Sequence, residues 1–363
     1  MTPNTKKALI AMSGGVDSSV AAHLMIQNGF DCIGVTMKLF DTNDDALQAH
    51  KEKSCCSLSD VNDARDVAYR LGIPHYVVNL SREFNQNVID RFVAVYEAGG
   101  TPNPCIDCNR FIKFNTLLLR AHQLEYDNLV TGHYAQIEPS GSRFLLKKSA
   151  DTQKDQSYVL YAMTQEQLAQ TVFPLGAMHK EEVRAIAAAQ KFINAHKKDS
   201  QDICFVPDGD YGTFMEKRKG KHYPEGNIID TSGNVIGRHK GFVRYTIGQR
   251  RGLGLSFPVP MYVSAKSARD NTVTLGTDTS LLSESLIAGD LNLIALERID
   301  KPLKVSVKTR YLQAEQPATV EQIAPDKIRI DFETPQRAIT AGQAAVFYDG
   351  EFVLGGGTID SAV

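Results

Sequence analysis

The sequence lacks any apolar run close to the roughly 18 residues that a membrane-spanning helix needs. The apolar run that follows Lys6 and Lys7 stops at Ser13, which is too short for the core of a signal peptide. Internal repeats and low-complexity segments are also absent. These absences argue against a membrane, secreted or repeat protein, and they predict a globular protein of the cytoplasm without a membrane partner.

Cysteine is scarce as well, with six residues in a chain of 363: Cys32, Cys55, Cys56, Cys105, Cys108 and Cys204. In a chain of this length without a signal segment, they do not indicate the disulfide framework of a small secreted protein. Catalytic, redox or metal-binding roles are the better interpretation of the spaced cysteines. Cys32 lies in a predicted strand, where we expect a small buried apolar side chain.

A large excess of charge of one sign is absent, because 40 Lys/Arg and 42 Asp/Glu leave a net charge of −2. The distribution is uneven, since residues 191–251 hold 12 Lys/Arg and 7 Asp/Glu, a local net of +5. Four further basic residues lie in one strand-like stretch without an acid between them: Lys301, Lys304, Lys308 and Arg310. Such tracts either bind a polyanion or form solvated faces, and charge alone leaves both interpretations open.

One expected lysine is missing from a glycine-bearing loop. Residues 13–18 read S-G-G-V-D-S directly after the apolar run Ala8-Leu9-Ile10, yet the lysine of the pattern G-x-x-x-x-G-K-[ST] does not follow. Phosphoryl transfer by the P-loop scheme is therefore not expected. Glycines still let backbone N–H groups approach a phosphate, and the following helix adds its positive end. Asp17 fits such a site if it meets Mg²⁺. The plain alternative, a tight turn with a serine cap, is less favoured for so long a string.

The first 135 residues alternate between predicted strands and helices. We expect strands at residues 8–12, 32–39, 75–80 and 128–131, and helices at 18–28, 61–71, 83–98 and 109–124. Ser59 is a candidate cap for the second helix, and residues 41–57 read as a long loop. This order predicts a parallel, doubly wound sheet, in which ligands bind beyond the carboxyl ends of the strands.

The pattern changes near residue 205, where proline and glycine mark a series of turns. From Asn227 onward the sequence predicts short alternating strands in small β-barrels or sandwiches, without a convincing helix. We therefore expect three domains: a catalytic α/β domain at 1–206, a β-rich domain at 207–283 and a β-barrel domain at 284–363.

Several motifs in a fixed order resemble known enzymes. S-G-G-V-D-S resembles the PP-loop of the ATP pyrophosphatases, which cleave ATP between its α- and β-phosphates. The chain from residue 6 to about 359 resembles the tRNA-specific 2-thiouridylases. The motifs that carry this resemblance are T-P-N-P-C-I-D-C-N-R-F-I-K-F at 101–114, G-H-Y at 132–134, K-D-Q-S-Y at 154–158, K-K-D-S-Q-D-I-C-F at 197–205, T-I-G-Q-R-R-G-L-G at 246–254 and V-K-T-R-Y at 307–311.

The resemblance implies a fold, a reaction and partners. It implies a PP-loop domain of the adenine nucleotide alpha hydrolase type, followed by two small β domains. The implied reaction is ATP-dependent 2-thiolation of the wobble uridine of tRNA, with AMP and pyrophosphate as by-products and Mg²⁺ as the metal. The implied partners are tRNAs of the Lys, Glu and Gln type and a cysteine desulfurase or sulfur-relay protein.

Residue roles follow from the same resemblance. Cys204 would carry a persulfide, and Cys108 would be the second catalytic thiol. Contacts to ATP are implied for Ala11, Met12, Ser13, Gly14, Gly15, Val16, Asp17, Ser18, Met37 and Gly132. Contacts to the target base are implied for Asn103, Pro104 and Cys105, and contacts to tRNA for Lys154, Asp155, Gln156, Arg310 and Tyr311. Core packing of Met37, an ordinary turn at Gly132 and charged surface for the tRNA set are the plain alternatives.

Cys105 departs from the family pattern, because many relatives have Asp at this position. Cys105, Cys108 and Cys204 could together bind a [4Fe–4S] cluster with one open iron. A zinc site with Cys55 or Cys56 as fourth ligand is another reading, and a metal-free persulfide–disulfide route is the third. In any of them a following helix, with Lys113 or Arg110, could lower the pKa of Cys108. For Asp199 and Asp202, a solvated surface position is the plain alternative.

Two other classes compete with this interpretation. One is a different PP-loop enzyme, such as an ammonia-using ligase or an arginine-pathway synthetase, which would not need paired cysteines in stiff loops or basic β domains. The other is an RNA-binding protein without activity, against which the intact S-G-G-V-D-S string argues. Only an enzyme would release pyrophosphate from ATP.

Overall fold

The structure is a computed structural model that describes residues 6–40, 58–199, 203–206 and 209–363. The chain forms two compact units. The first comprises residues 1–89, 105–207 and 351–354, and the second comprises residues 90–104, 208–350 and 355–363. The predicted division into three domains at 206/207 and 283/284 stays a prediction.

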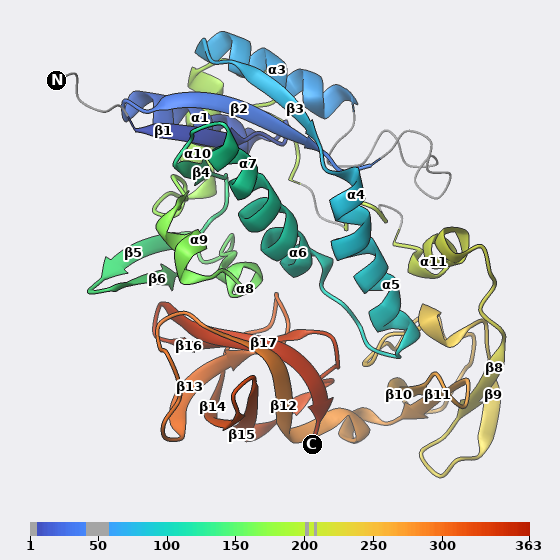
Figure 1. Ribbon diagram of the computed structural model, residues 1–363. Helices are drawn as coiled ribbons and strands as arrows, with labels where there is room; N and C mark the ends of the chain where they lie inside the picture. The colour runs from blue at the N-terminus through green and yellow to red at the C-terminus, as the bar shows by residue number, and fades with distance from the viewer. Residues whose placement is uncertain (1–5, 41–57, 200–202, 207–208) are drawn as a thin grey trace. The chain divides into compact units, whose positions relative to one another are not determined.

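A parallel sheet lies at the centre of the first unit (Figure 1), with the strand order β3-β2-β1-β4-β7. Its strands are β1 Lys7–Ala11, β2 Asp31–Lys38, β3 His75–Asn79, β4 Asn128–Val130 and β7 Thr171–Val172. The register pairs Leu9 with Ile33 on one side and with Leu129 on the other. The predicted parallel α/β sheet is confirmed.

Helices α1 Val16–Gln27, α3 Leu58–Leu71 and α10 Lys180–Ala189 pack their apolar residues into one buried cluster with the sheet. Val20 of α1, Val67 of α3 and Val183 of α10 are members of this cluster. Cys32 of β2 also belongs to it, as expected, and burial, with the charge of Asp31, raises the pKa of its thiol to about 11. This thiol is therefore a packing residue.

The other elements of the first unit are short. They are α4 Ser81–Phe84, η1 Asn85–Ile89, α6 Pro104–Asp107, η2 Cys108–Leu117, α7 Leu118–Gln123, the hairpin β5 Gln136–Ser140 with β6 Arg143–Lys147, α8 Ser157–Leu160 and α9 Gln165–Ala169. Phe352 and Val353 pair with Lys147 and Leu146 of β6.

Several predicted helix boundaries were wrong. Ser59 lies inside α3 and not at its cap. The helix expected at 109–124 begins at Pro104, because proline fits the first helical position, where its missing N–H costs nothing. Its middle is π-helical, and the hydroxyl of Thr116 donates to the carbonyl of Phe111, five residues earlier (2.8 Å). Cys105 and Cys108 consequently lie on a helix and not on the loop before one.

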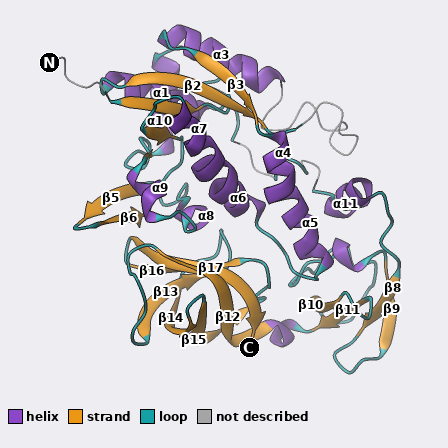
Figure 2. Ribbon diagram, viewed as in Figure 1, coloured by secondary structure: helices purple, strands orange, loops and turns teal. Residues whose placement is uncertain are grey.

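Strands make up most of the second unit (Figure 2). Six of them close into a barrel in the order β12-β15-β14-β13-β16-β17, because β12 also pairs with β17. They are β12 Leu282–Leu293, β13 Leu303–Lys308, β14 Gln316–Ala324, β15 Lys327–Arg337, β16 Ala344–Asp349 and β17 Phe352–Ala362. A separate sheet has the order β10-β11-β8-β9, with β8 Gly226–Ile229, β9 Val235–His239, β10 Tyr262–Ser267 and β11 Thr272–Gly276. The predicted β domains are confirmed.

Two helices complete the second unit, α5 Asp90–Glu97 and α11 Tyr211–Lys219, along with the short 3₁₀ turns η3 Phe242–Arg244 and η4 Asp278–Leu281. The sequence was read as turns at α11 because of Gly212 and Gly220. Asp210 caps this helix by accepting from the Thr213 N–H (3.0 Å), and Gly220 ends it at φ 61°. Both signals stood in the sequence.

Among the described helices, none is long and apolar enough to cross a membrane.

Candidate active site

The loop Ser13–Gly15 follows β1 at the carboxyl edge of the sheet and leads directly into α1. Gly14 has φ +74°, and a Cβ there would lie 2.3 Å from the carbonyl oxygen of Asp60, so that only glycine fits. The hydroxyl of Ser18 accepts from the Ser13 N–H (3.2 Å) and donates to the Gly15 carbonyl (3.1 Å). Ser13 is exposed and Ser18 is buried. Ser18 therefore shapes the loop from within, while Ser13 is accessible to a ligand.

Gly132 lies in the loop after β4, beside the start of α1. A Cβ at this position would come within 2.8 Å of the Asp17 carbonyl carbon and the Ser18 nitrogen. The missing side chain thus lets the two loops approach each other. This packing is a sufficient reason for glycine here, and the predicted contact of Gly132 with a nucleotide stays a prediction. Met37 is half-buried near the end of β2, and its contact with adenine also stays a prediction.

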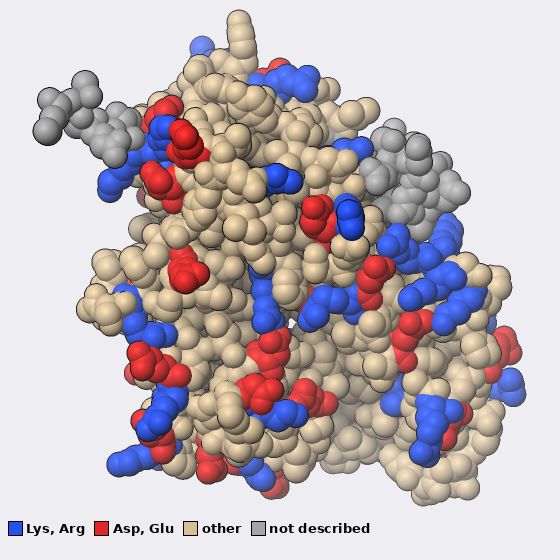
Figure 3. Space-filling model, in the orientation of Figure 1, with Lys and Arg blue, Asp and Glu red and all other residues tan. Residues whose placement is uncertain are grey.

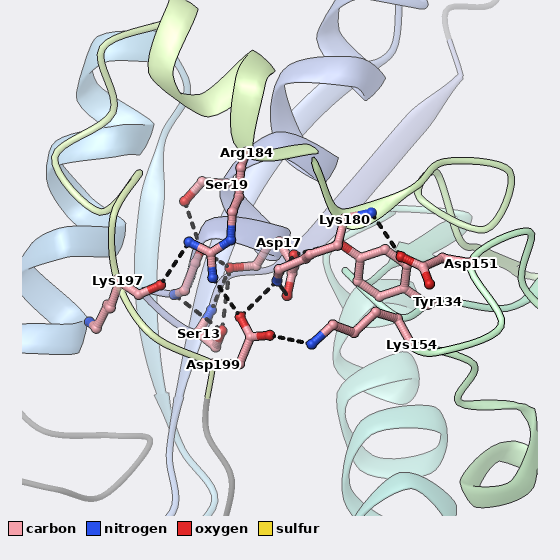
Figure 4. A network of polar contacts seen from close by, with 12 residues as sticks. Ser13, Asp17, Ser19, Tyr134, Asp151, Lys154, Lys180, Arg184, Lys197 and Asp199 are labelled. Carbon is pink, nitrogen blue, oxygen red and sulfur yellow. Dashed lines mark hydrogen bonds and ion pairs between the residues drawn. The ribbon is translucent and has the colours of Figure 1, made fainter. Parts of the chain in front are cut away.

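A lysine reaches the loop from a distant part of the sequence (Figure 4). The Nζ of Lys180, at the start of α10, donates to Oδ1 and Oδ2 of Asp17 at 2.7 and 2.8 Å. It also pairs with Asp199 at 2.9 Å, and its side chain is only 9% exposed. The hydroxyl of Tyr134 donates to Asp17 Oδ1 (2.8 Å), and burial together with Asp17 raises the pKa of Tyr134. The absent P-loop lysine therefore has a spatial counterpart.

Asp199 is the second centre of this network and is not the solvated residue that the plain alternative allowed. It accepts from Lys154 (2.8 Å) and pairs with Lys180 and with Arg184 (3.1 Å). Burial alone would raise the pKa of Asp199, but the hydrogen bonds from Lys154 and Lys180 outweigh burial and hold the pKa at about 2. Asp199 is thus ionised over the whole physiological range. Asp202 lies outside the described residues.

Residues 194–197 hold the opposite side of the loop. The amide nitrogen of Asn194 donates to the Gly14 carbonyl (3.0 Å) and to the Ser19 hydroxyl (2.9 Å). Lys197 donates to the same carbonyl (3.2 Å) and pairs with Asp60 and Asp63 of α3. The loop conformation is therefore fixed by side chains that follow it by about 180 residues.

The charges of the network determine what it can do. Three cations, Lys154, Lys180 and Arg184, are held by two carboxylates, Asp17 and Asp199. A phosphate group at the loop would meet backbone N–H groups, the positive end of α1 and these cations. The site is therefore suited to a polyphosphate, which could replace the carboxylates as the partner of the cations.

Cys105, Cys108 and Cys204 lie among the described residues: Cys105 is exposed, and Cys108 and Cys204 are half-buried. In the described part of the chain, no three His, Cys, Asp or Glu side chains come close enough to hold a metal ion. This finding concerns a single metal ion, and a [4Fe–4S] cluster on Cys105, Cys108 and Cys204 stays a prediction. The zinc alternative involves Cys55 or Cys56, which lie outside the described residues.

The cations predicted to lower the pKa of Cys108 have other contacts. The Nζ of Lys113 lies 3.2 Å from Nε2 of His133, and the guanidinium of Arg110 lies over the Phe111 ring. Burial, with the charge of Lys113, holds the pKa of His133 well below its usual value, so the imidazole is neutral. It can then accept from Lys113 while its Nδ1 meets the Thr131 hydroxyl (2.7 Å).

Comparisons with known proteins agree along the whole chain. Residues 6–208 match a family model described as a tRNA methyl transferase HUP domain, residues 212–277 its PRC-barrel domain and residues 283–359 an aminomethyltransferase beta-barrel domain. The tRNA-specific 2-thiouridylase of Symbiobacterium thermophilum is 50% identical over 99% of this chain and 94% of its own. That of Clostridioides difficile is 49% identical over 99% of both chains, and that of Clostridium kluyveri 48% over 98% and 99%. This chain belongs to the tRNA-specific 2-thiouridylase family. The predicted resemblance is confirmed.

Two residues that the 2-thiouridylase resemblance assigned to tRNA have structural contacts within the first unit. Both carboxylate oxygens of Asp155 accept from the turn around it, from the N–H of Ser149 (3.0 Å) and the hydroxyl of Ser157 (2.7 Å). Gln156 exchanges hydrogen bonds with the backbone of Tyr134 in both directions (3.0 and 2.9 Å). These residues shape the turn that carries Lys154. Their contact with tRNA stays a prediction.

Arg310 has the same character in the second unit. Its guanidinium donates to the carbonyls of Ile247 (3.1 Å) and Ala338 (3.0 Å) and to the Thr340 hydroxyl (3.1 Å). It fastens the T-I-G-Q-R-R-G-L-G loop to the end of β15. Tyr311, which follows it, is half-buried. A role for both in tRNA binding stays a prediction, and Arg310 has a structural role beside it.

Half of the twelve basic residues in the tract at residues 191–251 have an ion pair among the described residues. Arg218 pairs with Asp90 (3.1 Å) and Lys221 with Glu97 (2.8 Å), both on α5. In Figure 3, Lys and Arg gather over α11 at the right and are interspersed with Asp and Glu elsewhere on the displayed face. Ion pairs therefore compensate only part of the local net charge of +5, and both interpretations of the tract stay open.

The sequence analysis missed Lys180 and Arg184 as members of the site, and it quoted Tyr134 without a role. One local signal existed, because His179 and Glu182 form a capping box that marks the start of α10 at Lys180. That signal predicts a helix start but not its neighbour. The contact joins residues 163 positions apart, which no sequence pattern indicates.

Proposed function

We propose that this protein is a tRNA-uridine 2-sulfurtransferase that converts the wobble uridine of tRNA into 2-thiouridine with ATP. The observation that carries the proposal is identity of about half of all residues with tRNA-specific 2-thiouridylases over nearly the whole chain. The matched domain is described as a tRNA methyl transferase. A loop of the S-G-G-V-D-S type with a cation cluster supports a polyphosphate substrate, and it favours ATP chemistry over methyl transfer.

The first step activates the base. The C2 oxygen of uridine attacks the α-phosphorus of ATP, the bond to the β-phosphate oxygen breaks, and pyrophosphate leaves. The loop backbone and Ser13 would bind the phosphates, while Lys180 and Arg184 would exchange their carboxylate partners for phosphate oxygens. Mg²⁺ would be held by Asp17 together with phosphates and water, and it would neutralise charge on the leaving pyrophosphate. Met37 and Gly132 would border the nucleoside.

The second step replaces oxygen by sulfur. The terminal sulfur of a Cys204 persulfide attacks C2, and the C–O bond to AMP breaks. The Cys108 thiolate then attacks Sγ of Cys204, so the S–S bond to the base breaks and leaves 2-thiouridine and a Cys108–Cys204 disulfide. A thiol reductant must supply two electrons to reset the enzyme. Alternatively, Cys108 attacks the persulfide first and releases sulfide, which attacks C2. Neither step passes through a cluster, and the cluster route is the alternative that the test below separates.

The partners follow from this chemistry. The persulfide sulfur must come from a protein that carries activated sulfur, such as a cysteine desulfurase or a relay protein. The tRNA substrates would be those of the Lys, Glu and Gln type, and the reaction would take place in the cytoplasm. Asn103, Pro104 and Cys105 would contact the target base, and Lys154, Asp155, Gln156, Arg310 and Tyr311 would contact the tRNA.

The test is reconstitution without oxygen, using purified protein, ATP, Mg²⁺, an unmodified tRNA transcript and a sulfide or persulfide donor. We expect 2-thiouridine by mass spectrometry, together with AMP and pyrophosphate. Cys204→Ser and Cys108→Ser should lose thiolation with a persulfide donor, while the matched variant Cys105→Ser should keep most of it. Transfer of a labelled methyl group without 2-thiouridine would overturn the proposal. Loss of protein-bound iron together with thiolation in Cys105→Ser would replace the thiol route with a cluster route.

A further inference from the structure

The loop at residues 100–102, which precedes Cys105 and Cys108, is hydrogen-bonded to the C-terminal barrel within the second unit. Residues 90–104 belong to this unit, whereas Cys105 and the residues that follow it belong to the first. The N–H of Thr101 donates to the Ala341 carbonyl (2.8 Å). The side-chain nitrogen of Gln343 donates to the carbonyls of Thr101 (2.9 Å) and Pro102 (3.1 Å). We call residues 100–102, together with residues 341–343 and Lys266, the clasp.

Two glycines show how closely the backbones approach in the clasp. A Cβ on Gly100 would lie 2.8 Å from the Ala341 carbonyl oxygen. Gly342 has φ +86°, and a Cβ there would lie 2.5 Å from a methyl group of Val95 and 3.1 Å from the Thr101 carbonyl oxygen. No side chain fits between the two segments. The clasp is therefore a main-chain contact at minimum separation and not a loose surface contact.

The barrel side of the clasp is itself anchored. The N–H of Gly342 donates to the Ile359 carbonyl (2.9 Å), and the N–H of Ile359 donates to the Gln343 carbonyl (2.7 Å). Ile359 is a buried residue of β17. The position of the Gln343 side chain is thus set by a core strand of the closed barrel, which makes it a fixed donor for the loop.

Lys266 of β10 closes the clasp from the other side. Its Nζ donates to the carbonyls of Tyr245 (2.8 Å) and Gly100 (3.2 Å) and lies over the Tyr96 ring. No described acidic side chain is paired with it, and burial lowers its pKa to about 8. A buried cation without an acidic partner costs stability. The lysine thus serves the backbone carbonyls, including one on the loop.

We propose that the clasp fixes the backbone of the T-P-N-P loop for the target base, and that Gln343 and Lys266 are positioning residues for thiolation. The proposal rests on the proposed function, because only that function gives Asn103 and Cys105 a base to meet. Pro102 and Pro104 limit the freedom of the loop, and the clasp fixes the carbonyls of Gly100, Thr101 and Pro102. A displacement of reacting groups by about 1 Å can cost about 100-fold in rate.

A purely structural clasp would hold the fold together without affecting the reaction, so the test separates the two. Gln343→Met keeps the side-chain length but removes both donated bonds. Gln322→Met is the matched control, because it also removes two side-chain hydrogen bonds in the same barrel, one accepted from the Ile299 N–H (3.0 Å) and one donated to the Pro325 carbonyl (3.1 Å). Both proteins are assayed at a temperature at which circular dichroism shows them folded.

We expect Gln343→Met to lower kcat for thiolation by about 10- to 100-fold, with the KM for ATP within twofold of wild type. The control should stay within about threefold of wild type in both quantities. Lys266→Met should behave like Gln343→Met, and it serves as the second variant if that protein fails to fold. A kcat within twofold of wild type in both clasp variants, or an equal loss in Gln322→Met, would overturn the proposal.

Hydrogen exchange supplies a readout that needs no substrate. The Thr101 amide should be protected in wild type and exchange at least about tenfold faster in Gln343→Met, while the amides of β14 keep their rates. Unchanged protection of Thr101 in the variant would contradict the clasp even if the enzyme proved inactive on tRNA. Conversely, if wild-type protein does not thiolate tRNA but the Thr101 amide exchanges faster in Gln343→Met, only the proposed function is contradicted.

Discussion

The loop Ser13–Gly15 and the clasp are fixed in opposite ways. The first is surrounded by formal charges, with Lys180 and Lys197 each shared between two carboxylates. The clasp consists of one main-chain hydrogen bond, one neutral side-chain amide and a single cation that donates to two carbonyls and lies over the Tyr96 ring. An ion pair can be exchanged for another anion of equal charge, whereas a main-chain contact cannot. The first arrangement suits a site that must bind and release a polyphosphate, and the second suits a loop that must stay in place.

The largest expected effect comes from removing the exchangeable cation. Lys180→Met should lower the rate of pyrophosphate release by at least about 100-fold, comparable to the loss of one donor at a charged transition state. It also leaves Asp17 and Asp199 without their shared cation. The measurement is tRNA-dependent pyrophosphate release at saturating ATP, with ATP binding by calorimetry.

Lys147→Met is the matched control for that experiment. Lys147 pairs with Glu138 (3.0 Å) and Glu351 (3.3 Å) in the same unit, so it also loses two ion pairs. We expect near-normal turnover from the control. Turnover of Lys180→Met within threefold of wild type would show that this lysine only balances charge in the free protein.

The second largest effect is expected for a buried cation of the barrel unit. Arg310→Ala removes three internal hydrogen bonds and should lower the free energy of unfolding by about 3 kcal/mol, because bonds from a charged donor are among the stronger ones. Urea denaturation measures the change. Arg269→Ala is the control, since Arg269 is 91% exposed and, among the described residues, is paired with its neighbour Asp270 alone.

The same variant separates structure from tRNA binding. Under conditions where Arg310→Ala is folded, an unchanged salt dependence of its tRNA affinity would mean that Arg310 has a structural role only. A slope of log affinity against log salt concentration that is smaller by about one would indicate a lost phosphate contact. The stability prediction fails if Arg310→Ala unfolds at the same urea concentration as wild type.

Local patterns in the sequence were sufficient for the sheet and the barrel. Alternation of apolar runs and amphipathic segments located β1, β2, β3 and β4 to within one or two residues. Boundaries failed where the helix start had a less obvious signal, as at Pro104 and Asp210. Pro104 and Asp210 both favour the start of a helix, but the prolines or glycines near them led us to predict turns.

Only part of the candidate active site could be predicted from the sequence, and the reason is different. The loop itself is a contiguous string, so its chemistry could be read from residues 13–18. Its lysine comes from the start of α10, and the clasp joins residues about 240 positions apart. Such pairs are fixed by how elements pack, and a single sequence carries no periodicity that relates them.

The third effect tests the unpaired cation of the clasp through pH. Lys266 has a pKa of about 8 in the folded protein against an ordinary 10.5, so the unfolded chain binds more protons between these values. The free energy of unfolding therefore rises with pH across this window. Between pH 7 and 9.5 the contribution is about 2 kcal/mol. The free energy of unfolding of wild type minus that of Lys266→Met should therefore increase by this amount from pH 7 to 9.5. A difference that does not change with pH would contradict the buried, unpaired cation.

The smallest effect is expected where the charged network loses a neutral member. Tyr134→Phe removes the hydroxyl that donates to Asp17 but leaves both contacts of Lys180 to that carboxylate and keeps the ring beneath the ammonium. Because charge compensation is intact, we expect the KM for ATP to rise by only about three- to tenfold, the value of one hydrogen bond of about 1 kcal/mol. Tyr126→Phe is the control, since its ring lies near Lys7 in the same unit. A loss of activity as large as that of Lys180→Met would mean that Tyr134, and not the Lys180 ammonium, orients Asp17. The loop Ser13–Gly15 would then not be held by exchangeable ion pairs, and its contrast with the clasp would be wrong.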